Sequence, residues 1–501
     1  MSSTTAVTEP VEDVPTGPKK TQRITSGVAR VGVAAVAFAI LATVFGGIFA
    51  VATPPFWGHD EITQFGRAYQ VAHGGILPLK IKDDRGVAYG GTVPQTIDSV
   101  MGYAMRDYVN NPQEPAPMVA SEKHYDQLLD KPLTENHHVV WFTNTAAYSP
   151  VPYIPAAIGI RVATVLNLDV GNLLLLTRLA GLVAYVGVVF FGLRALRDSR
   201  VQWLAFTVAL LPIAVFQAGT ITADTLTNAL AIMVSALLVK ALFLGKDLSR
   251  PESAALLASA IVLPLCKPTY VLLAMLVVVV PIARYGLPAR FRLVPWAFAG
   301  VGGVLFLIWT KISSPTTAGM GLMRKPSQWH SVVPGDQLRG ILTNPIGFID
   351  VFGDSVMRRD QEWFTEFFGE LGFAYINVPA TSIVACLLAL AIAVGTAEQM
   401  VATHRRTAIV AVVIAATVAM IYVTLYLSFS PVDFYIIDGV QGRYFVPLAI
   451  LFFAALLRWM PLRLQAPTGQ LNMRGPAIAI VVATLISLLC AVWKYNVVVY
   501  G

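Results

Sequence analysis

The sequence predicts an all-α integral membrane protein that crosses the bilayer about 11 times. Hydrophobic residues make up 56% of the 501 residues and charged residues only 13%, whereas soluble domains carry about 25% charge. The apolar residues gather in runs close to the ~20 residues that a membrane helix needs. Lys and Arg outnumber Asp and Glu by 36 to 29 and cluster between these runs, as they do in cytoplasmic loops. This pattern argues against a soluble enzyme and against a nucleic-acid-binding protein.

The N-terminal segment, residues 1–27, is expected to be a disordered cytoplasmic tail. It is rich in Ser, Thr, Pro and charge, and it has Lys19, Lys20 and Arg23 near its end, so it cannot bury a core. The apolar run from Val31 to Ala52 is longer than the ~7–15 residues of a signal-peptide core, which favours a membrane anchor. Residues 28–501 are then expected to form one transmembrane domain with its N-terminus inside.

Further apolar runs predict the other spans, and the basic clusters between them set the direction of each helix. All clusters can be cytoplasmic only if an even number of spans separates one from the next. This parity requires 253–283 to be a hairpin of two short helices. It also requires 147–166, which begins with three prolines, to lie in the interface. The runs lie at 31–52, 173–193, 201–218, 225–244, 253–266, 269–283, 293–310, 379–397, 407–428, 445–457 and 476–493.

The same parity places two long segments, 53–172 and 311–378, outside the cell, together with the C-terminus. Both are expected to carry amphipathic helices that lie on the membrane surface, and the acidic-aromatic run 360–368 is one of them. The chain is therefore predicted to be a multi-pass protein of the plasma membrane, with its functional site on the external face.

The first candidate site directly follows the first span. Helical spacing places Asp60 and Arg67 on one face and Phe65 and Tyr69 on the other, so Asp60 is expected to face the external water. Its carboxylate could be functional, could cap the helix, or could do both. Glu61 points about 100° away, so only one of the two acids can face a substrate squarely.

Three more charged residues stand at the external ends of spans. Asp224 begins the fourth span, where the helix dipole favours a carboxylate with or without a function. Lys267 is the only charge between positions 253 and 283; a lysine at membrane depth is a functional candidate, although it could instead snorkel to the interface. Arg443 offers a planar fork suited to phosphate. With Asp60, these residues suggest an outward-facing site for an anionic lipid phosphate and a nearby base.

The sequence indicates no certain cofactor. The three cysteines lie in apolar runs, which argues against a disulfide framework and a zinc cluster. His137 and His138 are adjacent, so they point in different directions, and no third ligand is suitably spaced. No metal site is predicted, although a divalent metal stays possible. There is no Walker motif, dinucleotide fingerprint or nucleophile elbow.

The arrangement resembles a known superfamily. A long first external loop that opens with an acidic pair resembles the GT-C superfamily, polytopic glycosyltransferases that use polyprenyl-phosphate-linked sugars. More closely, the chain resembles a bacterial domain-of-unknown-function family of predicted integral membrane proteins that is thought to be GT-C-like. Phe373 stands where such proteins often carry tryptophan. The matching stretches are PPF at 54–56, DE at 60–61, RAY at 67–69, YSPVPY at 148–153, TAD at 222–224, KPTY at 267–270, GELGF at 369–373 and QGRYF at 441–445.

The resemblance implies a catalytic carboxylate. Asp60 would deprotonate an acceptor hydroxyl, which attacks the anomeric carbon of the sugar and displaces polyprenyl phosphate. Glu61 would support it, and the two roles could be reversed. The acceptor would be a glycan or lipid of the cell envelope.

The resemblance also assigns roles to the other candidates. Lys267 and Arg443 would bind the donor phosphate and stabilise its charge as it leaves. Arg67, Asp224 and Tyr444 would contact the substrate. The donor would be a polyprenyl-phosphate-linked sugar.

Two other functions compete with glycosyl transfer. A transporter or flippase of a lipid-linked saccharide would also need many spans and buried cations. Transporters usually show internal repeats and helices broken near the membrane midplane, whereas no repeat is visible here and the charged candidates lie on one face. A non-catalytic membrane scaffold would not explain why Lys267 and Asp60 are charged.

Overall fold

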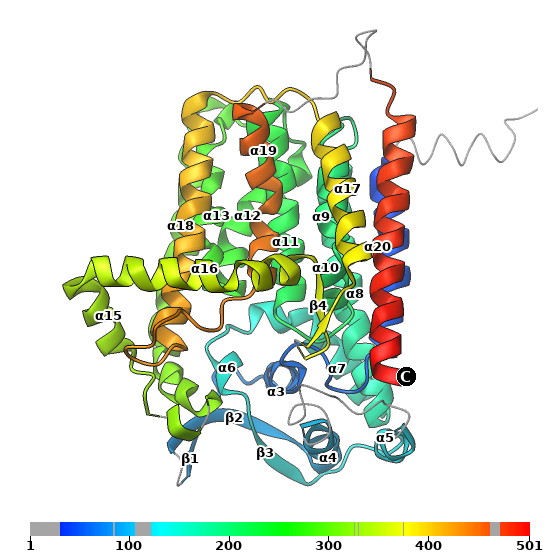
Figure 1. Cartoon of the computed structure of the whole chain (residues 1–501), viewed down its shortest axis with the longest axis vertical. Coiled ribbons are helices and arrows are strands. Elements are labelled where there is room, and N and C mark those ends of the chain that lie inside the picture. The colour runs from blue at the N-terminus through cyan, green and yellow to red at the C-terminus, as the bar shows by residue number, and fades with distance from the viewer. Residues whose placement is uncertain are drawn as a thin grey trace, which may run out of the picture.

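Long helices run side by side as a bundle, and a smaller layer of helices and strands caps one end of it (Figure 1). The computed structural model describes residues 31–83, 86–105, 122–324, 326–328, 330–373, 375–460 and 471–501. The predicted tail, 1–27, lies outside the described residues.

Within the described residues, seven helices are long and apolar enough to cross a membrane. A predominantly helical membrane protein is therefore confirmed. Alone or joined to a neighbouring short helix, these are α2 (Val33–Ala52), α8 (Val170–Ala195), α11 with η4 (Asp224–Leu238 and Val239–Phe243), η8 to η9 around α14 (Val294–Ser313), α18 (His404–Ser428), η11 with α19 (Gly442–Leu448 and Ala449–Trp459) and α20 (Arg474–Tyr500).

Shorter or broken helices occupy the remaining predicted runs and lie in the same bundle (Figure 1). Prolines explain two of the breaks, because the residue before a proline is pushed out of the helical region. Leu211 is extended before Pro212, and Lys267 is extended before Pro268, where the hairpin turn was predicted. These helices are α9 (Gln202–Ala209), α10 (Pro212–Ala218), α12 (Arg250–Cys266), η5 (Pro268–Tyr270), α13 (Val271–Met275), η6 (Leu276–Val279), η7 (Ile282–Tyr285), η8 (Ala289–Phe291) and α17 (Ala380–Thr396).

The described residues between 53 and 169 form the cap, which contains a sheet that the sequence analysis did not anticipate. Three antiparallel strands follow the order β1-β2-β3, with Leu79 opposite Gly90 and Gly90 opposite Trp141. The glycines in β2 make its sequence look unlike a typical strand, because glycine is uncommon in strand interiors. The elements are α3 (Glu61–Ala72), β1 (Leu79–Asp83), β2 (Gly86–Pro94), α4 (Gln95–Ala104), α5 (Glu122–Leu129), β3 (His137–Trp141), α6 (Thr143–Ala146), η3 (Val151–Tyr153) and α7 (Ile154–Val165).

The segment expected to lie in the interface, 147–166, forms η3 and α7. Helix α7 packs against α3 and α8. Its exposed side carries an apolar stripe at Ile154, Ile158, Val162 and Val165, the spacing of one helical face.

The second long segment, 311–378, is also helical, as predicted. Its longest helix, α16 (Pro345–Gly369), contains the acidic-aromatic run and lies across the bundle axis (Figure 1). A short hairpin then leads into α17. The other elements are η9 (Ser314–Met323), η10 (Pro326–Gln328), α15 (Pro334–Thr343), β4 (Glu370–Leu371) and β5 (Ile376–Asn377).

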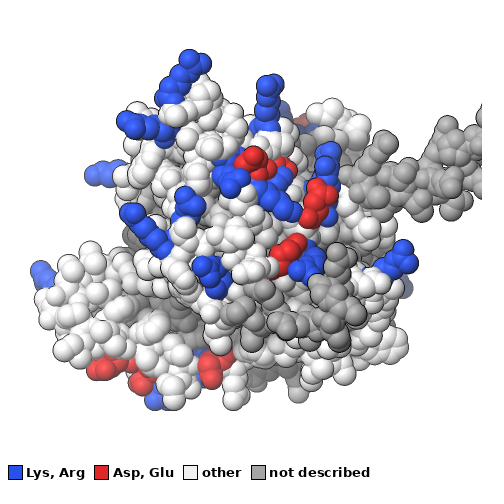
Figure 2. Space-filling view, turned by 90° about the horizontal axis from the view of Figure 1, so that it is seen from above, with Lys and Arg blue, Asp and Glu red and all other residues white. Residues whose placement is uncertain are grey.

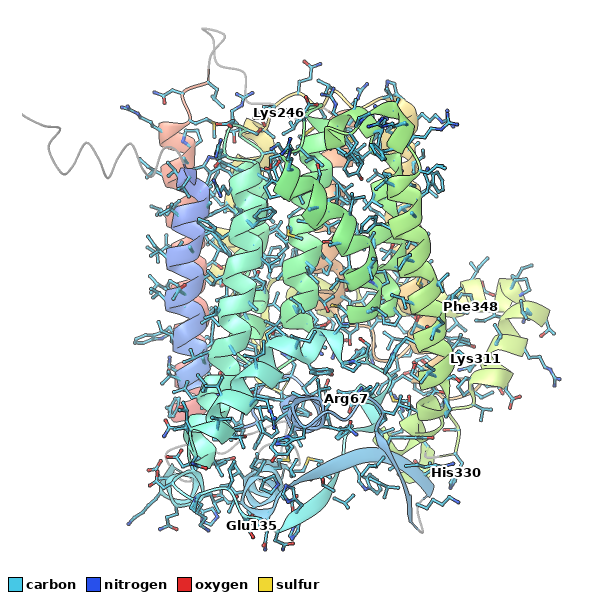
Figure 3. The ribbon with its side chains drawn as sticks, turned by 180° about the vertical axis from the view of Figure 1, so that it is seen from behind. Arg67, Glu135, Lys246, Lys311, His330 and Phe348 are labelled. Atoms are coloured by element: carbon cyan, nitrogen blue, oxygen red, sulfur yellow. The ribbon has the colours of Figure 1, made fainter. Side chains whose placement is uncertain are left out.

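One end of the bundle is rich in basic side chains. Figure 2 looks down on the end opposite the cap, and many Lys and Arg side chains stand around it. Figure 3 labels Lys246 at this end, whereas Arg67 and Glu135 lie in the cap.

Candidate functional site

Four of the predicted site residues meet where the bundle joins the cap. Lys267 Nζ lies 2.7 Å from Asp224 Oδ1, Arg443 Nε lies 3.6 Å from Asp224 Oδ2, and Arg443 Nη2 lies 3.9 Å from Asp60 Oδ2. The four side chains therefore form one row of alternating charge, Lys267–Asp224–Arg443–Asp60, which we call the charged row.

Each member of the charged row stands at a helix end. Asp224 is the first residue of α11, and Gln217 from α10 donates to its second carboxylate oxygen over 3.0 Å. Lys267 occupies the extended break between α12 and η5. Its ammonium is buried against Asp224, so the side chain does not snorkel to an interface.

The guanidinium of Arg443 carries donors that no acceptor among the described residues satisfies. Its side chain is only 7% exposed, yet in the described part of the chain its Nε and Nη1 atoms have no hydrogen-bond partner. The 3.6 Å to Asp224 is too long for a hydrogen bond. An unpaired buried donor costs about 1–3 kcal/mol, and a charged one costs more. Such a guanidinium is ready to receive an anion.

Asp60 precedes α3 but does not cap it. Its backbone is left-handed, with φ 51° and ψ 22°, and its side chain makes no capping hydrogen bond. A non-glycine residue in this region is uncommon and is often found at functional sites. The Asp60 side chain is 39% exposed. The protein atoms around it still limit hydration of the charged form and so raise the pKa of Asp60; Asp224 raises it further, while Arg443 and Lys267 oppose the change.

Glu61 is placed differently from its neighbour. Both of its oxygens are occupied, because Arg178 donates from Nε over 2.8 Å and from Nη2 over 2.7 Å, and the amides of Gly58 and Ile221 donate over 3.0 Å each. The side chain is fully buried. Of the two predicted acids, only Asp60 therefore keeps a carboxylate available to a substrate.

Arg178 was missed by the sequence analysis. It lies in α8, inside an apolar run, and it also donates to the carbonyl groups of Ala50, Thr53 and Pro54. The sequence could have indicated its importance, because an arginine inside a membrane span is energetically costly and is usually retained for a structural or functional role.

Arg67 is not brought to the charged row. Its buried guanidinium donates to Gln70 over 2.6 Å and to the carbonyl groups of Ile76 and Tyr148 over 2.7 Å and 3.1 Å. These hydrogen bonds give Arg67 a structural role, and its contact with a substrate stays a prediction. The helical spacing that placed it beside Asp60 fails because Asp60 has left the helical conformation.

Tyr444, a predicted substrate contact, lies at the charged row. The ammonium of Lys267 stands 4.1 Å from the centroid of its ring, a distance at which a cation is attracted to the aromatic face. The hydroxyl of Tyr270 donates to the Tyr444 carbonyl over 2.8 Å.

A cavity of about 390 Å³ begins at the charged row. Lys267, Tyr444 and Tyr148 line one part of it, and it continues between α14 and α18, both within candidate spans. Of the charged row, Lys267 lines the cavity, whereas Asp60, Asp224 and Arg443 do not. The lining side chains on these two helices include Phe306, Thr310 and Ser313 of α14 and Met420, Ile421, Thr424 and Leu425 of α18.

Two acids near Arg443 were not predicted as site residues. Glu366 is buried and accepts a hydrogen bond from the Gly442 amide, and Glu370 follows it in β4. Burial raises the pKa of both carboxyl groups; Glu362 adds to the shift of Glu366, and Glu366 adds to that of Glu370. Glu366 lies in the acidic-aromatic run 360–368 and Glu370 in the GELGF stretch, both of which the sequence analysis noted. Neither pattern indicates that these acids lie near Arg443.

The described residues contain no group of three His, Cys, Asp or Glu side chains that could hold a metal ion. His137 and His138 lie in β3, and His138 Nδ1 is 2.8 Å from Asp98 Oδ2.

Comparison with known proteins gave one match. A family model described as a predicted membrane protein (DUF2142) matches residues 43–452. A search of curated proteins found no match, and a search of solved structures found none either.

The Glu61–Arg178 pair should be essential for folding. Glu61→Gln leaves the buried guanidinium without its counter-charge, and breaking a buried pair in this way costs about 3–5 kcal/mol. We expect a clearly lower midpoint of thermal unfolding in detergent. Glu135→Gln, an exposed position in the cap, is the control, and equal midpoints for both variants would contradict the structural role.

Lys267 and Asp224 should behave as a coupled pair. Lys267→Met leaves the Asp224 carboxylate buried with less compensation, so we expect loss of stability. Adding Asp224→Asn removes the uncompensated charge and should recover part of it. Additive losses in a double-mutant cycle of unfolding midpoints would argue against the coupling.

Proposed function

This chain belongs to the DUF2142 family of predicted membrane proteins, and we propose that it is a membrane glycosyltransferase. It transfers a sugar from a polyprenyl-phosphate donor to a glycan or lipid of the cell envelope. The observation that carries the proposal is Arg443, a buried cation with two unpartnered donors. It shares the Asp224 carboxylate with Lys267, and Lys267 lines a cavity between two apolar helices. A ligand that suits both features is an anion with a long apolar chain.

The cavity supports a lipid-linked donor. A phosphate at the charged row would accept hydrogen bonds from Arg443 and meet the ammonium of Lys267, and guanidinium groups favour such forked contacts. The polyprenyl chain would lie between α14 and α18, against Phe306 and Met420. No nucleotide site is needed, because the sugar arrives on the lipid.

Asp60 is the base in the proposed reaction. Its carboxylate accepts the proton of the acceptor hydroxyl, and the hydroxyl oxygen forms a bond to the anomeric carbon of the sugar. The bond from that carbon to the phosphate oxygen breaks, and the phosphate leaves with the electron pair. Arg443 lies 3.9 Å from Asp60, so the base and the leaving group would be neighbours. The raised pKa of Asp60 makes its carboxylate a stronger base.

Asp224 has a different role in this mechanism. It lies between both cations, at 2.7 Å from Lys267 and 3.6 Å from Arg443. Its charge compensates them when no donor is bound and holds them in place for the phosphate.

The proposed topology has about 11 spans in the plasma membrane. The helices of the bundle coincide with the predicted runs, and the basic end lies opposite the cap. The N-terminus is then cytoplasmic, and the charged row lies near the external surface.

Asp60→Asn tests the proposed chemistry. The variant keeps the shape of the side chain but removes its basicity, and a positioned base contributes about 10²–10⁴-fold. With polyprenyl-phosphate sugars and extracted envelope glycans as substrates, we expect transfer to fall at least about 100-fold. Asp98→Asn, a carboxylate of the cap that pairs with His138, is the matched control.

The pH profile of wild-type transfer provides a second readout. Only the ionised carboxylate can accept a proton, so transfer is present above the Asp60 pKa and is lost as the pH falls through it. Because that pKa is raised, the loss should begin at a higher pH than for an ordinary aspartate. Undiminished transfer by Asp60→Asn would reject Asp60 as the base, and a lack of transfer by the wild-type protein would favour a transporter of lipid-linked saccharides.

Cysteine labelling tests the topology. Gly340 in α15 and Arg405 at the start of α18 are both exposed and lie on opposite sides of the predicted membrane. In a chain whose native cysteines are replaced, an impermeant maleimide should label Gly340→Cys in intact cells. Arg405→Cys should be labelled only after permeabilisation. The reverse pattern would invert the orientation.

A further inference from the structure

One side of α16 holds the chain segment that leads into Arg443. Four side chains of the helix contact four consecutive or nearly consecutive residues of this segment. The contacts are Ser355 Oγ accepting from Ile437 N (2.7 Å), Arg359 Nη2 beside Asp438 Oδ1 (3.3 Å), Trp363 Nε1 donating to Val440 O (2.9 Å), and Glu366 accepting from Gly442 N.

The four side chains have helical spacing. Positions 355, 359, 363 and 366 differ by four, four and three residues, so they share one face of α16. Ser355, Trp363 and Glu366 are buried. The helix therefore binds residues 437–442, which we call the 437–442 segment, along about three turns.

Gly442 makes the contact close. A Cβ atom at this position would lie 2.0 Å from the carbonyl oxygen of Trp363 and 2.5 Å from the amide nitrogen of Phe367. Only glycine therefore lets the 437–442 segment approach the helix backbone. Arg443 is the next residue, so the position of α16 sets where its guanidinium lies.

A second side of α16 is apolar and exposed. Ile346, Ile349, Met357 and Phe364 are between 51% and 81% exposed, and their spacing defines one stripe. The exposed Asp360 interrupts this stripe between Met357 and Phe364. Asp350 and Asp354 lie on the neighbouring polar side. A helix with a buried face, an exposed apolar stripe and a polar face is suited to the surface of a bilayer.

The position of the helix fits this environment. α16 runs across the bundle axis, and together with α15 it projects from the bundle (Figure 1). In Figure 2 the projecting lobe at the lower left is mostly uncharged on the side turned toward the viewer, with acidic and basic side chains at its edges. The exposed stripe would thus continue the apolar surface that the spanning helices present to lipid.

We propose that α16 is an arm that lies in the outer surface of the bilayer and positions Arg443. Its apolar stripe is in contact with lipid, and its buried face holds the 437–442 segment. Trp363 and Glu366 are then positioning residues for the donor phosphate, which is the part of the inference that rests on the proposed function. Movement of the arm in the membrane would move the guanidinium that binds the lipid phosphate.

The lipid contact can be measured without any substrate. Ile349 and Asp354 are five residues apart, so they point about 140° away from each other on the helix. Each is changed to cysteine in a chain whose native cysteines are replaced, labelled with a bimane fluorophore and placed in nanodiscs that contain nitroxide-labelled lipids. We expect quenching several-fold stronger for Ile349→Cys than for Asp354→Cys. Equal, weak quenching would mean that protein, such as a second copy of this chain, covers the stripe, and would overturn the proposal.

The positioning role requires a second measurement. Glu366→Ala removes the acceptor for the Gly442 amide, whereas Glu366→Gln keeps an oxygen there. We expect faster hydrogen exchange in the 437–442 segment for Glu366→Ala and near wild-type exchange for Glu366→Gln. We also expect about tenfold weaker binding of undecaprenyl phosphate by Glu366→Ala in nanodiscs, with rescue by Glu366→Gln, since a charge-assisted hydrogen bond is worth about that factor.

The outcomes separate the two proposals. Faster exchange with unchanged affinity for undecaprenyl phosphate would overturn the positioning role. If the wild-type protein does not bind undecaprenyl phosphate, the proposed function fails. Unchanged hydrogen exchange in Glu366→Ala would overturn the proposal that α16 positions the 437–442 segment. Asp354→Asn, on the polar side of the same helix, should leave exchange and affinity unchanged.

Discussion

The buried ion pair between Arg178 and Glu61 is the interaction on which the geometry of the site depends. Arg178 ties α8 to the carbonyl groups at the end of α2, and Glu61 ties the start of α3 to the amide of Ile221. Asp60 directly precedes Glu61, and Asp224 follows Ile221 by three residues. One pair therefore holds both carboxylates of the charged row. Two charges out of water are tolerated here because each oxygen of Glu61 accepts two hydrogen bonds.

The charged row contains equal numbers of positive and negative side chains, but not all of its hydrogen-bond donors are satisfied. Two carboxylates face two cations, so the burial of charge is compensated. Lys267 and Asp224 satisfy one another, whereas Arg443 lies beyond hydrogen-bond distance of both acids. Asp60 adds an unfavourable backbone conformation. Unsatisfied donors and backbone strain at the same place are features that a fold retains for function and stabilises from its surroundings.

The elements that hold Arg443 in place belong to two parts of the fold. The bundle provides Asp224 and Lys267, but the backbone before Arg443 is held by α16, a helix that lies across the bundle. The cation site thus combines helices that run along the bundle axis with one that lies across it. Such a site is sensitive to how the two sets of elements are positioned relative to each other.

The sequence by itself determined the helical membrane architecture, because apolar runs and basic clusters are local properties. It also identified Asp60, Asp224, Lys267 and Arg443, since charges at the ends of apolar helices are conspicuous. Only the tertiary structure showed that Glu61 is fully hydrogen-bonded, that Arg67 has partners within the cap, and that Arg178 and Glu366 support the charged row and its neighbours. The physical reason is distance along the chain: the partners of Glu61 lie 117 and 160 residues away. Whether a carboxylate is satisfied depends on those contacts, and no local pattern encodes them.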